Sequence, residues 1–457
     1  MTLEMHLFRL LTFAVSACGL FLMAAGARAM TVETICWQDR IDAVSQKGGG
    51  RVTIPPGRHI VGQLNLRSNV ELHLSDGAVL CGSTDLRHYS PVRPKCSEGD
   101  LWAIVMAVGV TNVSVTGFGK INGEGWRWKN YGHGVPSEGL RPRGLVFLDC
   151  KGVRLADFSL IDAACWGCVL HRCDGVVARN VKIDSHSNTN NDGFDIEASN
   201  VLIEECDVDS GDDAYVIKSN DHDFVVENVT IRKCVGRSTS NVFKIGTASH
   251  GIVRNIVFEN CRSEASRRSF AGPDGGEWFQ DYRMRSWPGA TTNLAAFSGF
   301  AVECVDGGVV SNVVGRKLDL NGVLVPFFIR GGARRGRSCG IPPNDKYVLS
   351  DVRIEDVVAT AESYVASSIT GVRKCRPRAV SLTNVLVDCK GAGPLSKSVS
   401  ADVPEEEGAY PESCMFHSIL PAYGLYVRHA EDVKFSNVKF RLQDGTTDCR
   451  VAIAEIK

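Results

Sequence analysis

A short repeated phrase constrains the fold of this chain more than any other feature. Asparagine is followed by Val or Ile, a variable residue and usually a second apolar residue, beginning at Asn69, Asn112, Asn180, Asn200, Asn228, Asn255, Asn312, Asn384 and Asn437. Copies between Asn180 and Asn255 lie 20, 28 and 27 residues apart, which is enough for short strands and turns but too little for helical crossovers. We therefore expect a solenoid, namely an all-β, right-handed parallel β-helix with loop insertions.

Other residues of the repeat also favour stacked coils. The Val, Ile, Leu and Phe side chains that point inward would form the core, and an Asn at the same turn of successive coils can hydrogen-bond to the next as a ladder. Cys206, Cys234 and Cys261 end the same strand in three coils, so we expect them to be stacked and buried. The alternative, an antiparallel β-sandwich, predicts tight hairpin turns about every 8 to 12 residues.

The composition excludes several functional classes. The 457 residues are 44% hydrophobic and 23% charged, and 51 Lys and Arg balance 52 Asp and Glu. A chain without excess positive charge has no electrostatic reason to bind nucleic acid or acidic membranes. Beyond the N-terminus, no apolar stretch is long enough to cross a bilayer. We expect neither a nucleic-acid partner nor membrane insertion.

The N-terminus has the pattern of a targeting segment. Residues 10–27 form an apolar run after Arg9, and the small-residue pattern at 27–29 suits signal peptidase. We expect a signal peptide over residues 1–29, a single β-helix catalytic domain over 30–457, and a periplasmic or secreted location. The alternative is a lipoprotein cleaved at Cys18. An oxidising compartment would permit disulfides among the remaining cysteines.

Acidic residues concentrate in two successive coils. Asp192 lies in NNDGFDI, and Asp212 and Asp213 lie in SGDDAYVIKS about one coil later, so their backbones should be roughly 4.8 Å apart on adjacent rungs. Three carboxylates so close cannot all ionise easily, and one should keep a proton near neutral pH. An acid beside a base suits hydrolysis of a glycosidic bond. The alternatives are a solvated acidic turn or a calcium site.

At these residues the chain resembles glycoside hydrolase family 28, the polygalacturonase-like enzymes. The resemblance begins at RVTIPPGRHIVGQLNLRSNVELHLSDGAVLCGS and continues through GFGKINGEGW and RPRGLVFLDC to the acidic coils. Asn190, Asn191 and Asp192 match the family's Asn-Thr-Asp motif, and Asp212 and Asp213 match its paired aspartates. The resemblance implies that Asp212 is the general acid and that Asp192 and Asp213 hold the attacking water. It also implies inversion, with carboxyl groups roughly 6.5 to 9.5 Å apart.

Two segments depart from the family pattern. The Gly-His-Gly segment aligns with Ser240, Asn241 and Val242, so an asparagine replaces the expected histidine. Asparagine can orient a sugar hydroxyl or the acid, but it does not titrate. The Arg-Ile-Lys segment, which the family uses to hold an acidic sugar, aligns with Ala301, Val302 and Glu303. A carboxylate at Glu303 would repel galacturonate, which indicates an altered sugar specificity.

The remaining candidate substrate-binding residues are amide or cationic side chains near these motifs: Asn190, Asn241, Lys218, Lys244 and Arg330. The two lysines are about one coil apart and either line the cleft or pair with nearby carboxylates. Arg330 either replaces the missing cation or belongs to a solvated arginine-rich loop.

Several other segments have two interpretations. Trp166 is a core or a sugar-contacting residue, and residues 264–296, with Trp278, Phe279, Tyr282 and Trp287, shape the binding face or only cover coil edges. The irregular residues 391–423 include Cys414 and are expected to form a loop, which a disulfide would tie. The cluster Cys165, Cys168, His171 and Cys173 resembles a zinc motif but lacks a second ligand pair. We expect no metal and no cofactor.

Taken together, these observations predict an inverting glycoside hydrolase that cleaves a pectic or related plant polysaccharide. The substrate is a polysaccharide or oligosaccharide, and a solenoid with capped ends is expected to be a monomer. The alternatives are a polysaccharide lyase on the same fold and a non-catalytic carbohydrate-binding β-helix.

Overall fold

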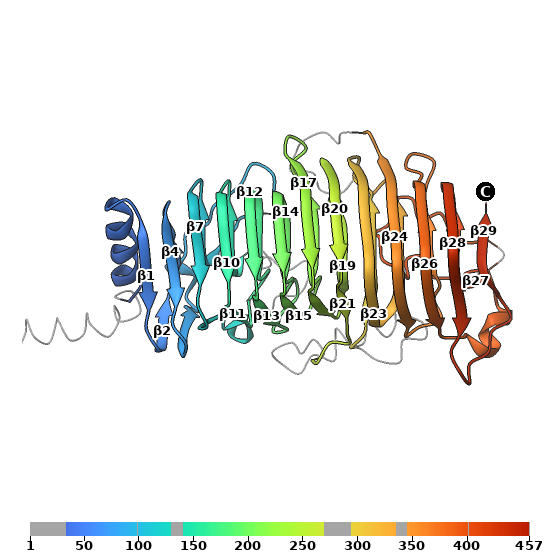
Figure 1. Cartoon of the computed structure of the whole chain (residues 1–457), viewed down its shortest axis with the longest axis horizontal. Coiled ribbons are helices and arrows are strands. Elements are labelled where there is room, and N and C mark those ends of the chain that lie inside the picture. Colours follow the sequence, from blue (N-terminus) through green and yellow to red (C-terminus); the bar gives the residue numbers. More distant parts are fainter. Residues whose placement is uncertain are drawn as a thin grey trace, which may run out of the picture.

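The chain winds into an elongated parallel β-helix, as the repeat predicts (Figure 1). The computed structural model describes residues 33–97, 99–128, 140–268, 294–334, 345–400 and 402–456. Every ladder between named strands in these ranges is parallel, which excludes the antiparallel sandwich. Connections between parallel strands of one sheet are right-handed, and the solenoid is a right-handed β-helix.

Three faces of parallel strands enclose the core. The first face consists of β1 (Gly50–Ile54), β4 (Val70–Leu74), β7 (Thr111–Thr116), β10 (Lys151–Ala156), β12 (Cys168–Arg179), β14 (Phe194–Glu204), β17 (Val225–Arg232), β20 (Ile252–Glu259), β23 (Val309–Gly331), β24 (Val348–Ala361), β26 (Arg378–Cys389) and β28 (Glu431–Leu442). The second consists of β2 (Gly57–Val61), β5 (Ala78–Gly82), β8 (Lys120–Asn122), β11 (Ser159–Ile161), β13 (Lys182–Ser185), β15 (Asp207–Ser210), β18 (Val235–Ser238) and β21 (Arg262–Ser263).

The third face carries the acidic motifs at its edge. It consists of β3 (Leu64–Asn65), β6 (Ala103–Val108), β9 (Arg143–Leu148), β16 (Tyr215–Ser219), β19 (Asn241–Ser249), β22 (Ala296–Cys304), β25 (Ser367–Thr370), β27 (Ala422–Arg428) and β29 (Val451–Ile456). The longer strands β12, β14 and β23 bend round corners and contribute to more than one face. Short 3₁₀ turns lie at Leu86–His88, Gly125–Arg127 and Gly393–Lys397.

The interior is filled by the inward side chains of all three faces. The rings of Phe194, Tyr215 and Phe243 stack on successive coils, with 5.8 and 5.6 Å between ring centres. Cys206, Cys234 and Cys261 are buried free thiols, as their spacing predicts. Cys414 packs beside a separate buried cluster around Phe297, and a disulfide that ties its loop stays a prediction.

The asparagine ladder is confirmed, but the nine Asn residues belong to two corners instead of one. Asn69, Asn112, Asn200, Asn228, Asn255 and Asn312 share the corner before the first face, and Nδ2 of Asn228 donates to Oδ1 of Asn200 at 3.0 Å. Asn180, Asn384 and Asn437 occupy the next corner, where Nδ2 of Asn437 donates to Oδ1 of Asn384 at 3.0 Å. Both corners need a left-handed backbone, which Asn tolerates, so one phrase recurs at two places in a coil.

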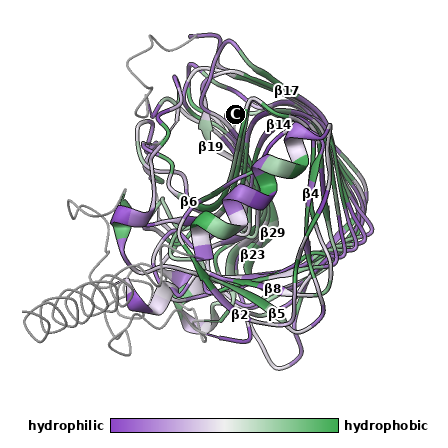
Figure 2. Cartoon of the chain, turned by 90° about the vertical axis from the view of Figure 1, so that its left-hand side faces the viewer, coloured by the Kyte–Doolittle hydropathy of each residue, from purple (hydrophilic) through white to green (hydrophobic). Residues whose placement is uncertain are grey.

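A helix over residues 33–46 covers the N-terminal end of the solenoid, as the view along the axis shows (Figure 2). Trp37 and Ile41 are buried against the first coils, and the Glu33 carboxylate accepts the Ile60 backbone N–H at 2.8 Å. Within the described ranges, no helix combines the length and apolar character that crossing a bilayer requires. The predicted signal peptide, residues 1–29, lies outside the described residues.

Candidate active site

Asp192, Asp212 and Asp213 lie side by side at the edge of the third face. The turn before β14 carries Asp192 and the turn before β16 carries the other two, and one carboxylate oxygen from each lies within 4.8 Å of the others. The backbones approach closely because Gly193 has no side chain: a Cβ there would lie 2.3 Å from the carbonyl oxygen of Ala214. The predicted meeting of distant aspartates is therefore present, and we name the three the carboxylate cluster.

Asp213 is the ionised member of the carboxylate cluster. Its side chain is buried, yet Oδ2 lies 3.0 Å from Nζ of Lys244, and Oδ1 accepts hydrogen bonds from Nδ2 of Asn241 at 2.9 Å and Oγ of Ser240 at 3.0 Å. Burial alone would raise the pKa of Asp213, but Lys244 and Asn241 more than offset it, and the pKa is lowered. Asn241 thus supports a negative charge in the place where the family pattern has histidine.

The other two aspartates hold protons more tightly. Burial and the neighbouring carboxylate of Asp195 raise the pKa of Asp192 well above its usual range, although Lys218 acts against them. Burial and the negative charge of Asp213 raise the pKa of Asp212. The pKa values of the cluster are therefore shifted in opposite directions, lowered for Asp213 and raised for Asp192 and Asp212.

Asp195 is a fourth carboxylate, which the sequence reasoning missed although it lies in the same motif. Lys218 Nζ is 2.7 Å from Asp195 Oδ1 and 3.4 Å from Asp192 Oδ2. Asp195 pairs in register with Val216, and Val216 pairs with Lys244 on the next strand. The three-residue spacing from Asp192 to Asp195 was a signal that could have found it.

The distances between the carboxylate oxygens of the cluster can be compared with those expected for inversion at the anomeric carbon. An inverting pair is usually separated by roughly 6.5 to 9.5 Å to admit water, whereas the nearest oxygens of the carboxylate cluster lie within 4.8 Å. These nearest-atom distances therefore do not reproduce the separation that the resemblance implies.

The two asparagines before Asp192 shape the turn that presents it. Asn190 adopts a left-handed backbone conformation, with φ at 55°, and its Oδ1 accepts a hydrogen bond from the buried guanidinium of Arg141 at 3.2 Å. Asn191 is fully buried, and its Nδ2 donates to the carbonyl oxygen of Ala163 at 2.8 Å. Arg141 therefore holds Asn190, Asn191 holds the turn, and contact of Asn190 with the substrate stays a prediction.

A pocket opens beside Asp195 and Lys218. Trp166 lines it together with His171, Glu197, Asn220 and several apolar side chains, and Nζ of Lys218 lies 4.3 Å from the centre of the Trp166 ring. The same tryptophan packs with Cys165 and Val169. Trp166 is largely buried and also lines a pocket next to the carboxylates, and its contact with a sugar stays a prediction.

Arg330 is not among the partners of the carboxylate cluster. Its guanidinium is buried, and Nη2 donates to the backbone carbonyls of Glu405 at 2.8 Å and Glu406 at 3.0 Å. Burial and the nearby Arg428 lower the pKa of Arg330 to about 10. The structure therefore gives Arg330 a contact with residues 402–413, and a direct contact with substrate stays a prediction.

Residues of that segment reach the cluster from far along the chain. Tyr410 donates or accepts a hydrogen bond with the Thr247 hydroxyl at 3.1 Å, and its ring centre lies 5.9 Å from Lys244 Nζ. Glu412 acts electrostatically on Lys244, Glu303 and the aspartates. Nothing in the repeat places these two residues at the site, because they belong to an irregular excursion between strands.

The structure argues against a metal role for the cysteine cluster. Cys168 and Cys173 pack into the main core, Cys165 belongs to a different cluster, and His171 Nδ1 is 2.9 Å from Glu197 Oε2. The carboxylate cluster has oxygens close enough for a cation, but Ca²⁺ prefers six to eight oxygens. Lys218 and Lys244 already neutralise these carboxylates, and the absence of a metal stays a prediction.

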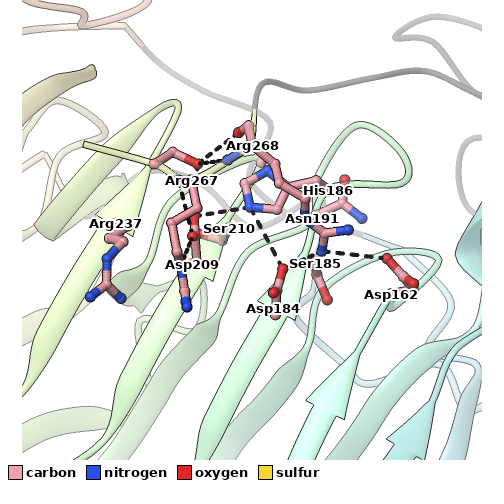
Figure 3. A network of polar contacts seen from close by, with 12 residues as sticks. Asp162, Asp184, Ser185, His186, Asn191, Asp209, Ser210, Arg237, Arg267 and Arg268 are labelled. Atoms are coloured by element: carbon pink, nitrogen blue, oxygen red, sulfur yellow. Dashed lines mark hydrogen bonds and ion pairs between the residues drawn. The ribbon is translucent and has the colours of Figure 1, made fainter. Parts of the chain in front are cut away.

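A second polar network lies beside the candidate site and anchors the chain after β21 (Figure 3). His186 Nε2 is 3.0 Å from Asp209 Oδ1, the same oxygen accepts a hydrogen bond from Ser266 Oγ at 2.7 Å, and Arg267 Nε donates to Oδ2 at 2.8 Å. Arg268 pairs with Asp184. The network fixes residues 266–268, and the aromatic residues predicted to shape the binding face, 278–287, lie outside the described residues.

Comparisons with known proteins show which family and which fold the chain is similar to. Residues 45–270 match the family model described as glycosyl hydrolases family 28. A probable polygalacturonase of Vitis vinifera is 24% identical over 284 residues, which cover 56% of this chain and 57% of the relative. The chain therefore spans a little over half the length of this curated relative.

Solved structures share the fold. A family 28 exopolygalacturonase of Yersinia enterocolitica has a TM-score of 0.62 at 17% identity and covers 92% of this chain and 74% of its own. An exopolygalacturonase of Thermotoga maritima has a TM-score of 0.58 at 22% identity and covers 77% of this chain and 82% of its own. At these identities the likeness supports the β-helix and does not specify the substrate.

Proposed function

This chain belongs to glycosyl hydrolases family 28 through residues 45–270, and we propose that it is an inverting glycoside hydrolase that cleaves a pectic or related plant polysaccharide. The observation that carries the proposal is the carboxylate cluster, in which Asp213, with a lowered pKa, lies beside Asp192 and Asp212, whose pKa values are raised. Acid and base assistance at one glycosidic bond needs both forms together.

In the proposed reaction, Asp212 donates its proton to the glycosidic oxygen as the bond to the anomeric carbon breaks. Burial and the negative charge of Asp213 raise the pKa of Asp212, which favours its role as the proton donor. Protonation makes the departing sugar a neutral alcohol, so no alkoxide has to leave.

Asp213 is the stronger base of the cluster, and with Asp192 it orients the attacking water. The ion pair with Lys244 keeps Asp213 charged, so it can take a proton from water as the oxygen attacks the anomeric carbon. Asp192, whose pKa is raised, holds the same water by a hydrogen bond. Lys218 and Lys244 limit the repulsion among these carboxylates.

The test is the variant Asp212→Asn, with Asp223→Asn as the matched control, because Asp223 is exposed and pairs only with surface cations in the described structure. Loss of the acid should lower kcat on pectic oligosaccharides by about 10²- to 10⁴-fold without unfolding the protein. Proton NMR of the first sugar released reports the anomer. Unchanged turnover in Asp212→Asn would reject the acid assignment, and retention would reject inversion.

The same assay separates hydrolysis from the alternatives. A lyase leaves an unsaturated uronide that absorbs ultraviolet light, whereas hydrolysis does not. A non-catalytic binder would release no product from any glycan. Hydrolysis predicts new reducing ends without a rise in absorbance.

We further propose that the protein is exported, with residues 1–29 removed, and works as a monomer in the periplasm or outside the cell. A polymer too large to enter the cytoplasm is degraded outside it, and the apolar run after Arg9 has the pattern of a signal peptide. N-terminal sequencing of the exported protein and its mass by light scattering test both statements.

A further inference from the structure

One flank of the carboxylate cluster contains two carboxyl groups that the proposed reaction does not use. Lys244 Nζ lies 3.0 Å from Asp213 Oδ2 and 4.0 Å from Glu303 Oε2. Tyr410 and Glu412 complete this flank from the segment 402–413. We name Lys244, Glu303, Tyr410 and Glu412 the Lys244 group.

Two arginines and a serine fix the segment that carries Tyr410 and Glu412. Arg330 donates to the carbonyls of Glu405 and Glu406, and Arg428 Nη2 donates to the carbonyl of Pro404 at 2.8 Å. The hydroxyl of Ser413 donates to the carbonyl of Phe297 in β22 at 3.0 Å. Buried guanidinium groups that satisfy several backbone carbonyls hold a loop rigidly, so the Lys244 group is preformed.

The cations near this flank are already engaged by carboxylates of the protein. Lys244 is buried and pairs with Asp213, and Lys218 pairs with Asp192 and Asp195. Arg334, whose guanidinium lies 5.4 Å from the Tyr410 ring centre, forms two hydrogen bonds with buried Asp306, at 3.0 and 2.8 Å. A carboxylate on a substrate would have to compete with these protein carboxylates for the cations.

The carboxyl groups of the flank, by contrast, are short of partners. Glu303 has an exposed fraction of 0%, and the Thr247 side chain is its neighbouring hydrogen-bonding group. Within the described residues, Oε2 of Glu412 has no hydrogen bond of normal geometry. Burial raises the pKa of Glu303 to about 7 and that of Glu412 to about 8, although Lys244 lowers both. A carboxyl group that keeps its proton can donate as well as accept a hydrogen bond, which suits a hydroxyl group better than another anion.

Tyr410 gives the flank an apolar surface. Its side chain is 55% exposed although its hydroxyl is tied to Thr247, so one end of the ring is fixed while its face remains accessible. The electron-rich face of an aromatic ring packs well against the C–H groups of a sugar.

From this arrangement we propose that the Lys244 group forms a sugar subsite that accepts an uncharged sugar residue and rejects a uronate. The proposal deepens the proposed function and rests on it. Tyr410 stacks on the sugar, the half-buried Glu412 hydrogen-bonds its hydroxyls, and Glu303 with Lys244 sets the charge behind them. A uronate at this position would bring its carboxylate toward Glu303 and Glu412 without an uncommitted cation among the described residues.

The experiment uses the full chain and matched pectic oligosaccharides of one linkage, one with uronic acids throughout and one chemically reduced so that the carboxylates become hydroxymethyl groups. The original protein should hydrolyse the reduced substrate with a kcat/KM that is about tenfold or more above its kcat/KM for the uronate substrate. At about pH 9, above the pKa of about 8 that burial gives Glu412, Glu412→Gln removes a charge at nearly constant shape. It should then raise kcat/KM for the uronate and narrow the ratio about fivefold or more.

Glu407→Gln is the matched control, because Glu407 is exposed on the same segment and should leave the ratio unchanged. Thermal unfolding of each variant checks that it folds. Two results overturn the subsite alone. The first is a higher kcat/KM of the original protein for the uronate substrate than for the reduced one. The second is a ratio of the two kcat/KM values that changes by less than about twofold in Glu412→Gln. Failure to hydrolyse either substrate, or any neutral or acidic pectic oligosaccharide, overturns the proposed function together with the subsite.

Discussion

Lys244 and Asp213 form a buried ion pair at the centre of the candidate site, with 3.0 Å between Nζ and Oδ2. Lys244→Met should leave the carboxylate of Asp213 buried without its cation, which costs about 3 to 5 kcal/mol of unfolding free energy. The pKa of Asp213 should then rise, and activity near neutral pH should fall and partly return at higher pH. Urea unfolding and a pH profile of kcat/KM measure the two effects.

The control for this prediction is Lys434→Met, because the Lys434 side chain is 72% exposed and pairs only with Asp432 in the described structure. Its effect on stability should stay within about 0.5 kcal/mol. An unshifted pH profile in Lys244→Met would contradict the idea that the lysine keeps Asp213 ionised.

Glu303 makes the stability of the protein depend on pH. Burial raises its pKa from the ordinary 4.5 to about 7, so the folded state holds this proton more tightly than the unfolded state. The stabilisation is complete below pH 4.5 and is lost as the pH rises to about 7. Relative to Glu303→Gln, the original protein should lose on the order of 3 kcal/mol over this window.

Urea unfolding at pH 4.5, 6 and 7.5 measures this difference, and Glu407→Gln, changed at an exposed site, is the control. Parallel stability curves for the original protein and Glu303→Gln would mean that Glu303 titrates normally.

Asn228 tests the corner ladder. Its backbone φ is 56°, and its side chain bonds to Asn200 and Asn255 at 3.0 and 3.1 Å. Asn228→Ala should cost about 1 to 2 kcal/mol because alanine resists this conformation. Asn228→Gly removes the same side chain but tolerates the backbone, so it should cost less in urea unfolding. Equal costs for the two variants would assign the whole effect to the ladder hydrogen bonds.

Asp209 should control how readily the chain that follows β21 unfolds locally. It receives hydrogen bonds from Ser266 and Arg267 and pairs with His186. Asp209→Asn removes the charge that holds these groups, and trypsin should cleave after Arg267 or Arg268 about tenfold faster. Cleavage is followed by mass spectrometry.

Asp207→Asn serves as the comparison, because Asp207 pairs chiefly with Arg237 and is less buried. Equal cleavage rates in Asp209→Asn and the original protein would show that other contacts hold residues 266–268.

The fold could be predicted because its corners leave a local signature. A left-handed backbone conformation favours Asn, so Asn recurs at the corners of successive coils and the sequence contains a recognisable repeat. The two separate rows were not predicted, because Asn180 and Asn200 satisfy the same local requirement at different corners. Two asparagines with the same local backbone conformation can lie at different corners, so the sequence does not reveal which asparagines stack on each other in successive coils.

The candidate site likewise contains residues that the sequence predicts and residues that it does not. Asp192, Asp212 and Asp213 follow from one coil's spacing, and the structure brings them together with Lys218, Lys244 and Asn241. Tyr410 and Glu412 could not be found, because the excursion that carries them has no repeat from which its position could be calculated. Arg330 pairs in register with Glu303 on the preceding coil, but register does not say which way a long side chain turns.

The helix over residues 33–46 has a consequence for how these molecules can associate. A parallel β-helix ends in open strand edges whose backbone groups invite another copy, and unlimited head-to-tail growth requires two such edges per molecule. The helix covers the core at the first coil with Trp37 and Ile41, and Glu33 satisfies the backbone N–H of Ile60. A second copy would have to displace this helix in order to stack on the first coil, whereas β29 leaves the opposite terminus of the solenoid ending in a strand.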